Sequence, residues 1–320
     1  MERDLSFDYL KGILIYLVVL GHSISWFCET YTQNFVYNLI YSFHMPLFVA
    51  ISGYFSLSSI NNTFLVTLKK KTTRLIFPII CWSLIFFLFD LFVKHKNITF
   101  YLYYTELRKV WYLVCIFALT ILFNLIWKCK YKKALTIATI IISFTVLYNY
   151  IPIDVLIHFQ IIRQMPFFLG GILLATNQLW YQRISSRHIL ILSVSIFLIW
   201  LLLFRLNPSN YSINRINYII REFIYLSASI LMFNLLRKTY FSMLNAQCTK
   251  WILLIGRNSL GIYLLNSILL DVIKLNISKP YIINPIYILL ISIVVTYLCY
   301  RITLLFNLNT TLKKYLLGEK

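Results

Sequence analysis

Ten long apolar stretches run through this chain with only short loops between them, and this pattern limits what the chain can fold into. A membrane-spanning helix needs about 20 apolar residues, and each stretch approaches that length. The chain is 60% hydrophobic and 12% charged, with a mean hydropathy of +0.77, whereas soluble domains carry about 25% charged residues. We therefore expect an all-α, polytopic membrane bundle that forms a single membrane-embedded domain over residues 1–320. The expected spans are 11–28, 37–57, 76–93, 110–127, 134–150, 155–175, 188–204, 217–236, 252–270 and 284–306.

The first apolar stretch has the length of a secretory signal peptide. Signal peptides end in a small-residue cleavage site, but this stretch runs into SISWFCETY and is interrupted by the polar step Gly21-His22-Ser23. We expect it to be retained as the first membrane helix.

Basic residues set the expected orientation of the chain. A formal charge of +20 would suit a nucleic-acid binder, but the cations lie in short loops between spans, where the positive-inside rule expects them. The clusters KKKTTR (69–74) and KCKYKK (128–133) therefore favour cytoplasmic N- and C-termini in a plasma membrane. The loop 94–109 is an exception, because its KHK and RK would lie outside.

The six cysteines are scattered and mostly fall inside the expected spans. A free thiol there behaves as a small hydrophobe. The spacing indicates neither a disulfide framework nor a metal site.

Polar residues on the first span form a stripe. Asp8, Lys11 and His22 are 3 and 11 residues apart, which at about 100° per residue places them within roughly 60° of one another. Lys11 and His22 are separated by about 16 Å along the helix axis. Ionisable residues inside a membrane normally face a bundle interior or a wet cavity. A purely structural hydrogen bond between helices is an equally good interpretation of His22.

The second span carries another histidine in FHMPLFVAISGYF. His44 lies a few residues below the outer end of this span and should reach a depth similar to that of His22. Pro46 and Gly53 interrupt the helix pattern. Such residues indicate either a functional kink or close helix packing.

Cations gather at the expected cytoplasmic face. KKKTTRLIFP (69–78) opens the third span, and such a run often anchors anionic lipid headgroups. Lys11, Arg74 and the segment GRNS (256–259) would share this face. Because arginine and lysine suit phosphates, a polyphosphate site is the second interpretation.

Four further residues fall near the depth of the histidines on the outer side: Trp111, Arg163, Arg221 and Glu222. An aromatic belt alone would explain Trp111. An Arg-Glu pair that holds two helices together explains the charged residues as well as a substrate contact does. The layout as a whole, with cations inside and histidines further out, suits chemistry conducted across a membrane.

Several segments together resemble the membrane-bound acyltransferases of acyltransferase family 3, which include sugar and cell-surface polysaccharide O-acetylases such as fucose 4-O-acetylase-like members. The segment RDLSFDYLKGILIYLVVLGH (3–22) is similar to their N-terminal signature, a basic residue followed eleven positions later by histidine. Other similar segments, in the same order along the chain, are FHMPLFVAISGYF, KKTTRLIFP, WYL (111–113), MPFFLGGIL and GRNSLGIYLLN. Two positions depart from the family pattern: Lys11 stands where many members have arginine, and Asn266 where many have histidine.

The resemblance implies transfer of an acyl group, usually acetyl from cytoplasmic acetyl-CoA, to a hydroxyl of a cell-surface glycan or lipid-linked sugar. His22 would be the general base, since an imidazole with a pKa of about 6.5 can take a hydroxyl proton, and His44 would orient the acceptor or stabilise the oxyanion. An acyl-histidine intermediate stays open. The remaining expected contacts are Lys11, Arg74 and Arg257 to the phosphates of coenzyme A, and Arg163, Glu222 and Trp111 to the acceptor.

Two other classes stay open beside the enzyme. A transporter or flippase for a lipid-linked saccharide would also carry buried histidine and arginine across many spans. A structural subunit of a glycan-assembly complex would tolerate replacement of these residues. The expected partners are acyl-CoA, a glycan acceptor and membrane lipids, without nucleic acid or metal.

Overall fold

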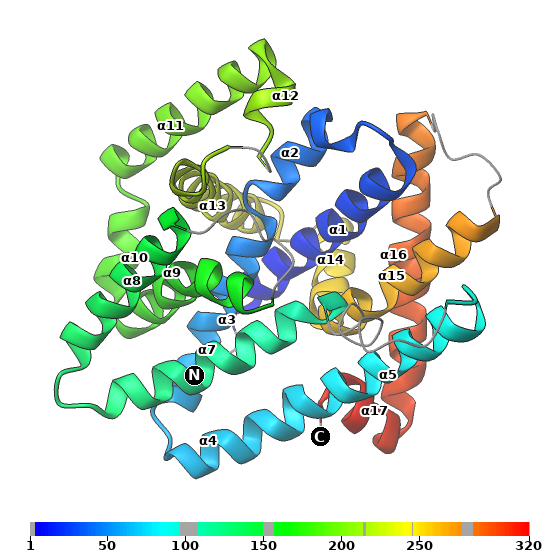
Figure 1. The fold of residues 1–320 in the computed structure, drawn as a ribbon, viewed down its shortest axis with the longest axis horizontal. Helices are drawn as coiled ribbons and strands as arrows, with labels where there is room; N and C mark the ends of the chain where they lie inside the picture. Colours follow the sequence, from blue (N-terminus) through cyan, green and yellow to red (C-terminus); the bar gives the residue numbers. More distant parts are fainter. Residues whose placement is uncertain are drawn as a thin grey trace. The chain divides into compact units, whose positions relative to one another are not determined.

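A computed structural model describes residues 4–96, 108–149, 157–213, 216–244, 246–276 and 284–319. The regular elements of these residues are helices (Figure 1), which agrees with the predicted all-α class. The longer helices are α1 (Leu5–Phe27), α2 (Phe35–Tyr41), α3 (His44–Ile60), α4 (Phe64–Lys71), α5 (Phe77–Phe92), α7 (Trp111–Lys128), α8 (Lys132–Asn149), α9 (Ile157–Thr176), α10 (Gln178–Ile184), α11 (Arg187–Leu206), α13 (Tyr218–Ser242), α14 (Gln247–Arg257), α15 (Ser259–Asn276), α16 (Pro285–Leu308) and α17 (Thr310–Leu317). Short turns are η1 (Tyr31–Gln33), η2 (Thr72–Ile76) and α12 (Pro208–Tyr211).

In the described residues, seven helices are long and apolar enough to cross a membrane, or eight if one bent pair counts as a span. The expected span 252–270 differs most from the structure, because it is divided into α14 and α15, which meet at an angle of 80°. At 11 residues, α14 is too short to cross a bilayer alone. The expected spans 134–150 and 155–175 fall on α8 and α9 and partly on residues outside the description.

The helices form two compact groups, each described here by itself. Unit 1 contains residues 1–48 and 177–304, and unit 2 contains residues 49–176 and 305–320. The expectation of one membrane-embedded domain stays a prediction.

Helix α1 is the centre of unit 1. It packs against α14, α15, α13 and α2, so that neighbours distant in sequence surround it (Figure 1). Its apolar side chains are almost inaccessible, with Leu10, Leu14 and Val19 all 0% exposed. A helix buried on most sides is apolar all round, which explains the long hydrophobic run of the first span.

Two glycines bring α1 and α14 into backbone contact. A Cβ on Gly12 of α1 would lie 2.1 Å from the carbonyl oxygen of Ile252, and a Cβ on Gly256 of α14 would lie 1.8 Å from that of Asp8. Both distances are far shorter than any contact that a real side chain makes. Membrane helices use small residues for such close approach, so these glycines set the spacing and register of the pair.

Unit 2 joins α3 to α7 through buried polar side chains. The Ser52 hydroxyl lies 2.7 Å from that of Tyr112, and the amide of Asn124 donates to the carbonyl oxygens of Ile60 (2.8 Å) and Asn62 (3.0 Å). Interhelical hydrogen bonds of this kind hold membrane bundles together, because water is absent as a competing partner.

The C-terminal helix α17 covers the turn that carries Arg74. That turn, η2, is a π-helical segment, a form that often accompanies functional sites. Trp82 donates its indole N–H to the carbonyl oxygen of Leu316 at 2.9 Å. Gly318 has a φ of +65°, and a Cβ there would lie 1.9 Å from the carbonyl oxygen of Arg74. Only glycine fits this close, left-handed position.

The basic loop that opposed the expected orientation has a structural role. Asp90, whose side chain is 0% exposed, pairs with Lys94 at 3.0 Å and Lys109 at 3.5 Å, and also with Lys96. A buried carboxylate needs such partners. Three of the four cations of this loop therefore neutralise the buried carboxylate of Asp90. Their number is correspondingly weaker evidence for the side of the membrane on which the loop lies.

Two adjacent glycines of α9 provide a test of the packing in unit 2. A Cβ on Gly171 would lie 1.8 Å from the carbonyl oxygen of Ala50 on α3, whereas a Cβ on Gly170 would meet nothing within 4 Å. We expect Gly171→Ala to lower the thermal midpoint of the purified protein, since overpacking costs about 1–3 kcal/mol. Gly170→Ala gains the same helix propensity without the clash and should leave the midpoint unchanged or higher. Equal midpoints for the two variants would contradict this packing.

Candidate functional site

The stripe on α1 begins with a buried carboxylate and a lysine. The Nζ atom of Lys11 lies 3.2 Å from Oδ1 of Asp8, one helical turn away. The Asp8 side chain is only 4% exposed, whereas that of Lys11 is 24% exposed. The ammonium group is therefore held at the edge of the protein by a carboxylate behind it.

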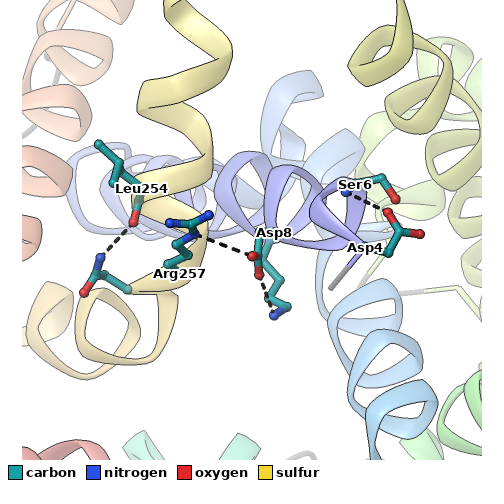
Figure 2. Close-up of polar contacts among 7 residues, drawn as sticks. Asp4, Ser6, Asp8, Leu254 and Arg257 are labelled. Carbon is teal, nitrogen blue, oxygen red and sulfur yellow. Dashed lines mark hydrogen bonds and ion pairs between the residues drawn. The ribbon is translucent and has the colours of Figure 1, made fainter. Parts of the chain in front are cut away.

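Arg257 joins this pair from α14. Its Nε atom lies 3.8 Å from Oδ2 of Asp8, and Figure 2 shows Asp8 on α1 facing Arg257 on the neighbouring helix. One carboxylate thus positions two cations, which leaves a net positive charge at this place. We name Asp8, Lys11 and Arg257 the cation cluster.

Local sequence explains why these side chains meet. Lys11 precedes Gly12, and Arg257 follows Gly256. Because the helices touch at these glycines, the two cations also lie at the contact. The chain then turns at Asn258, whose amide donates to the carbonyl oxygen of Leu254 at 2.8 Å. Arg257 ends α14, where the helix dipole favours a positive charge.

His22 lies further along α1 and contacts α15. Its Nδ1 atom is 2.7 Å from the side-chain oxygen of Asn266. Asn266 is 0% exposed, while His22 is partly accessible. The cation cluster and His22 therefore lie along the same helix of unit 1, with Lys11 and His22 about 16 Å apart. Both α14 and α15 pack against that helix.

His44 begins α3 and is 3% exposed. Its Nδ1 atom donates to the carbonyl oxygen of Ile40 at 2.7 Å, because a carbonyl oxygen can only accept. The edge of the ring packs on Tyr41 with centroids 4.7 Å apart. His44 and His22 are close enough to interact electrostatically, so the structure brings the two expected histidines into one region of unit 1.

Glu222 and its neighbour Arg221 lie on α13 in the same unit, with 4% and 1% of their surfaces exposed. Arg221 donates to the carbonyl oxygen of Ile213 at 3.5 Å, and the backbone N–H of Ile213 donates to Asn38 at 2.7 Å. These bonds fasten the segment before α13 onto α2. Arg221 thus helps to hold this segment in place, while both interpretations of the Arg-Glu pair, a link between two helices and a substrate contact, stay predictions.

Three expected site residues belong to unit 2, so their distances to the histidines are not defined. Arg74 lies in η2 beneath Gly318. Trp111 begins α7 and packs edge-on against Tyr112 with ring centroids 6.3 Å apart. Arg163 is 9% exposed within α9.

Two residues at the site carry roles that the sequence did not assign. Asp8 was placed on the stripe, but its function as the anchor of both cations depends on Arg257, which lies 249 positions later in the numbering. Asn266 was noted only as a departure from a family pattern. A signal for it existed, since an amide inside the apolar run GIYLLNSILL must find partners there.

Two known proteins are similar in sequence to part of this chain. A stretch of 86 residues is 43% identical to Nodulation protein NolL of Sinorhizobium fredii (strain NBRC 101917 / NGR234), covering 25% of this chain and 24% of that protein. A match of 86 residues to Nodulation protein NolL of Mesorhizobium japonicum (strain LMG 29417 / CECT 9101 / MAFF 303099) is 42% identical and covers 25% of this chain and 23% of that protein. The match thus spans about a quarter of the length of these relatives.

The sequence profile of the acyltransferase domain covers far more of the chain, from residue 4 to residue 304. This range includes the cation cluster, both histidines and Asn266, and it excludes α17. The chain therefore belongs to acyltransferase family 3.

Proposed function

We propose that this protein transfers an acetyl group from cytoplasmic acetyl-CoA to a hydroxyl of a cell-surface polysaccharide or lipid-linked sugar. The observation that carries the proposal is the arrangement on α1, where a cation cluster and an oriented histidine lie about 16 Å apart on one buried helix within a family match that covers both. The proposal includes a plasma-membrane bundle of ten spans with both termini in the cytoplasm.

The cation cluster would hold the phosphates of coenzyme A. Lys11 and Arg257 are 24% and 44% exposed at their side chains, so both can reach a ligand while Asp8 keeps them in place. Charge-assisted hydrogen bonds to phosphate are among the strongest that a protein makes. The long pantetheine arm would then extend along α1 and carry the thioester toward His22.

His22 would act as the general base of the transfer. Its Nε2 atom takes the proton of the sugar hydroxyl while the hydroxyl oxygen attacks the thioester carbonyl. The C–S bond then breaks, the coenzyme A sulfur leaves as a thiolate, and the imidazolium returns its proton to that sulfur. Positioned proton transfer of this kind is worth about 10²- to 10⁴-fold in rate.

The hydrogen bond of His44 favours one of its two expected roles. Because Nδ1 of His44 carries the proton donated to Ile40, Nε2 of the neutral ring can only accept. An accepting nitrogen suits the orientation of a sugar hydroxyl, whereas an oxyanion needs donors. We therefore assign His44 to orienting the acceptor.

The other expected contacts remain part of the proposal. Glu222 lies buried in the same unit as the histidines and offers acceptor oxygens for sugar hydroxyls. Arg74 is proposed as a further phosphate contact, and Arg163 and Trp111 as further acceptor contacts.

One observation favours the alternative of a saccharide transporter. A broken helix such as α14–α15, bent by 80°, is typical of transporter binding sites. Movement of a lipid-linked saccharide across vesicle membranes without consumption of acetyl-CoA would support that alternative.

The proposed base is tested with His22→Gln. We expect the variant to insert and fold normally but to lose turnover about 10²- to 10⁴-fold, the usual contribution of general-base catalysis. Purified protein in detergent is incubated with radiolabelled acetyl-CoA and glycans from the host surface, and base-labile ester is counted. His188→Gln changes an exposed histidine at the start of α11 and should retain full activity. Full turnover by His22→Gln would rule out the mechanism.

The proposed donor site is tested with Lys11→Gln and Arg257→Gln. Each removes a charged hydrogen-bond donor, worth about 1.5–3 kcal/mol, and should raise the KM for acetyl-CoA about 10- to 100-fold with a smaller effect on kcat. Arg301→Gln is a matched control, because Arg301 bonds within α16 to Tyr297 at 2.9 Å. Unchanged KM values in both cluster variants would place coenzyme A elsewhere.

A further inference from the structure

We propose that Asn266 is a positioning residue that holds His22 in the tautomer needed for catalysis, with the proton on Nδ1 and the lone pair on Nε2. The inference rests on the proposed role of His22 as the base. It gives a function to a buried amide that neither the composition nor the comparisons assign.

The orientation of the Asn266 amide follows from its own helix. Its nitrogen lies 3.2 Å from the carbonyl oxygen of Ile262 and also within bonding distance of that of Tyr263. Both partners can only accept, so the NH₂ group must point toward them. The side-chain oxygen is then the atom that faces His22, at 2.7 Å.

This orientation fixes the proton on the imidazole. An amide oxygen accepts hydrogen bonds and never donates them, so Nδ1 of His22 carries the hydrogen. In the neutral ring the lone pair therefore lies on Nε2, the nitrogen directed away from Asn266. Which nitrogen of a histidine is protonated is set by the bond that the other one makes.

The same contact also fixes the plane of the ring. Asn266 is 0% exposed and is tied to two carbonyl groups of α15, so its oxygen has little freedom. His22 sits on α1, which is buried along most of its length. A base held in one tautomer and one plane is in the reactive arrangement for a larger fraction of the time. Buried acceptors orient other catalytic histidines in the same way.

A simpler role for Asn266 would be to join α15 to α1. Its two amide hydrogens bond within α15, so only the bond from His22 crosses between the helices. Another hydrogen bond to α1 provides the comparison. The hydroxyl of Ser292 on α16, a residue that is 0% exposed, donates to the carbonyl oxygen of Leu289 at 2.7 Å and accepts from the hydroxyl of Tyr16 at 3.2 Å. A joining role predicts that loss of either bond has the same consequences.

The first test reads the tautomer directly. Nitrogen-15 spectra of the full chain, labelled at its five histidines, distinguish protonated from unprotonated ring nitrogens, and His22→Gln identifies the His22 signals. We expect wild type to show Nδ1–H alone, and Asn266→Leu to show a mixture of both tautomers. Retention of the Nδ1–H form alone in Asn266→Leu would overturn the inference, as would an Nε2–H form in wild type.

The second test separates positioning from joining by kinetics. Asn266→Leu should lower kcat roughly 10²-fold or more, by analogy with triads that lose the correct tautomer, with KM for acetyl-CoA changed less than about threefold. Ser292→Ala should lower the thermal midpoint without lowering kcat. Equal kcat losses in Asn266→Leu and Ser292→Ala would overturn the inference.

The two proposals fail in different ways. If wild type transfers no acetyl group but the His22 spectrum depends on Asn266 as expected, the reaction is wrong and the hydrogen-bond assignment holds. If transfer requires His22 but tolerates Asn266→Leu, the reaction holds and the positioning role is wrong.

Discussion

The backbone contact between α1 and α14 is the constraint on which the cation cluster depends. At Gly12 and Gly256 the two helices lie so close that even one added methyl group would displace them. The contact between the two backbones therefore brings the residues next to these glycines, Lys11 and Arg257, to the same carboxylate. Close packing of small residues gives the membrane helices their register, and here register determines which charges meet.

Three buried polar groups of the described residues each bind more than one partner. Asp8 holds two cations from different helices, Asp90 holds three lysines, and Asn266 links its own helix to an imidazole. An ionised or polar group without partners is costly in a medium of low dielectric constant. Sharing one group between several partners limits the number of such groups that the interior must accommodate.

The sequence predicted the helical class, the stripe on α1 and the region of the cation cluster, because helical periodicity and apolar length are local properties. It did not predict the 80° break between α14 and α15. The polar step GRNS (256–259) interrupts the apolar run at this point, but it was included in one span, and the end of the helix follows from the tertiary contact with α1. The partners of Asp90 were interpreted as a topology signal for the same reason, because a count of charges contains no information about pairing. Asn266 was visible as an unusual residue, but its role depends on a distance to His22 across 244 positions.

The pairing of the first helix with late ones also determines when the site can exist. Helix α1 is synthesised first, while Arg257 and Asn266 emerge about 250 residues later, roughly 10 to 50 seconds at ordinary rates of translation. During that interval Asp8 has Lys11 as a neighbour on its own helix, and the imidazole of His22 has no fixed acceptor from α15. A nascent chain that has inserted most of its spans is therefore still without the cation cluster and the hydrogen bond from His22 to Asn266, which form only when α14 and α15 dock.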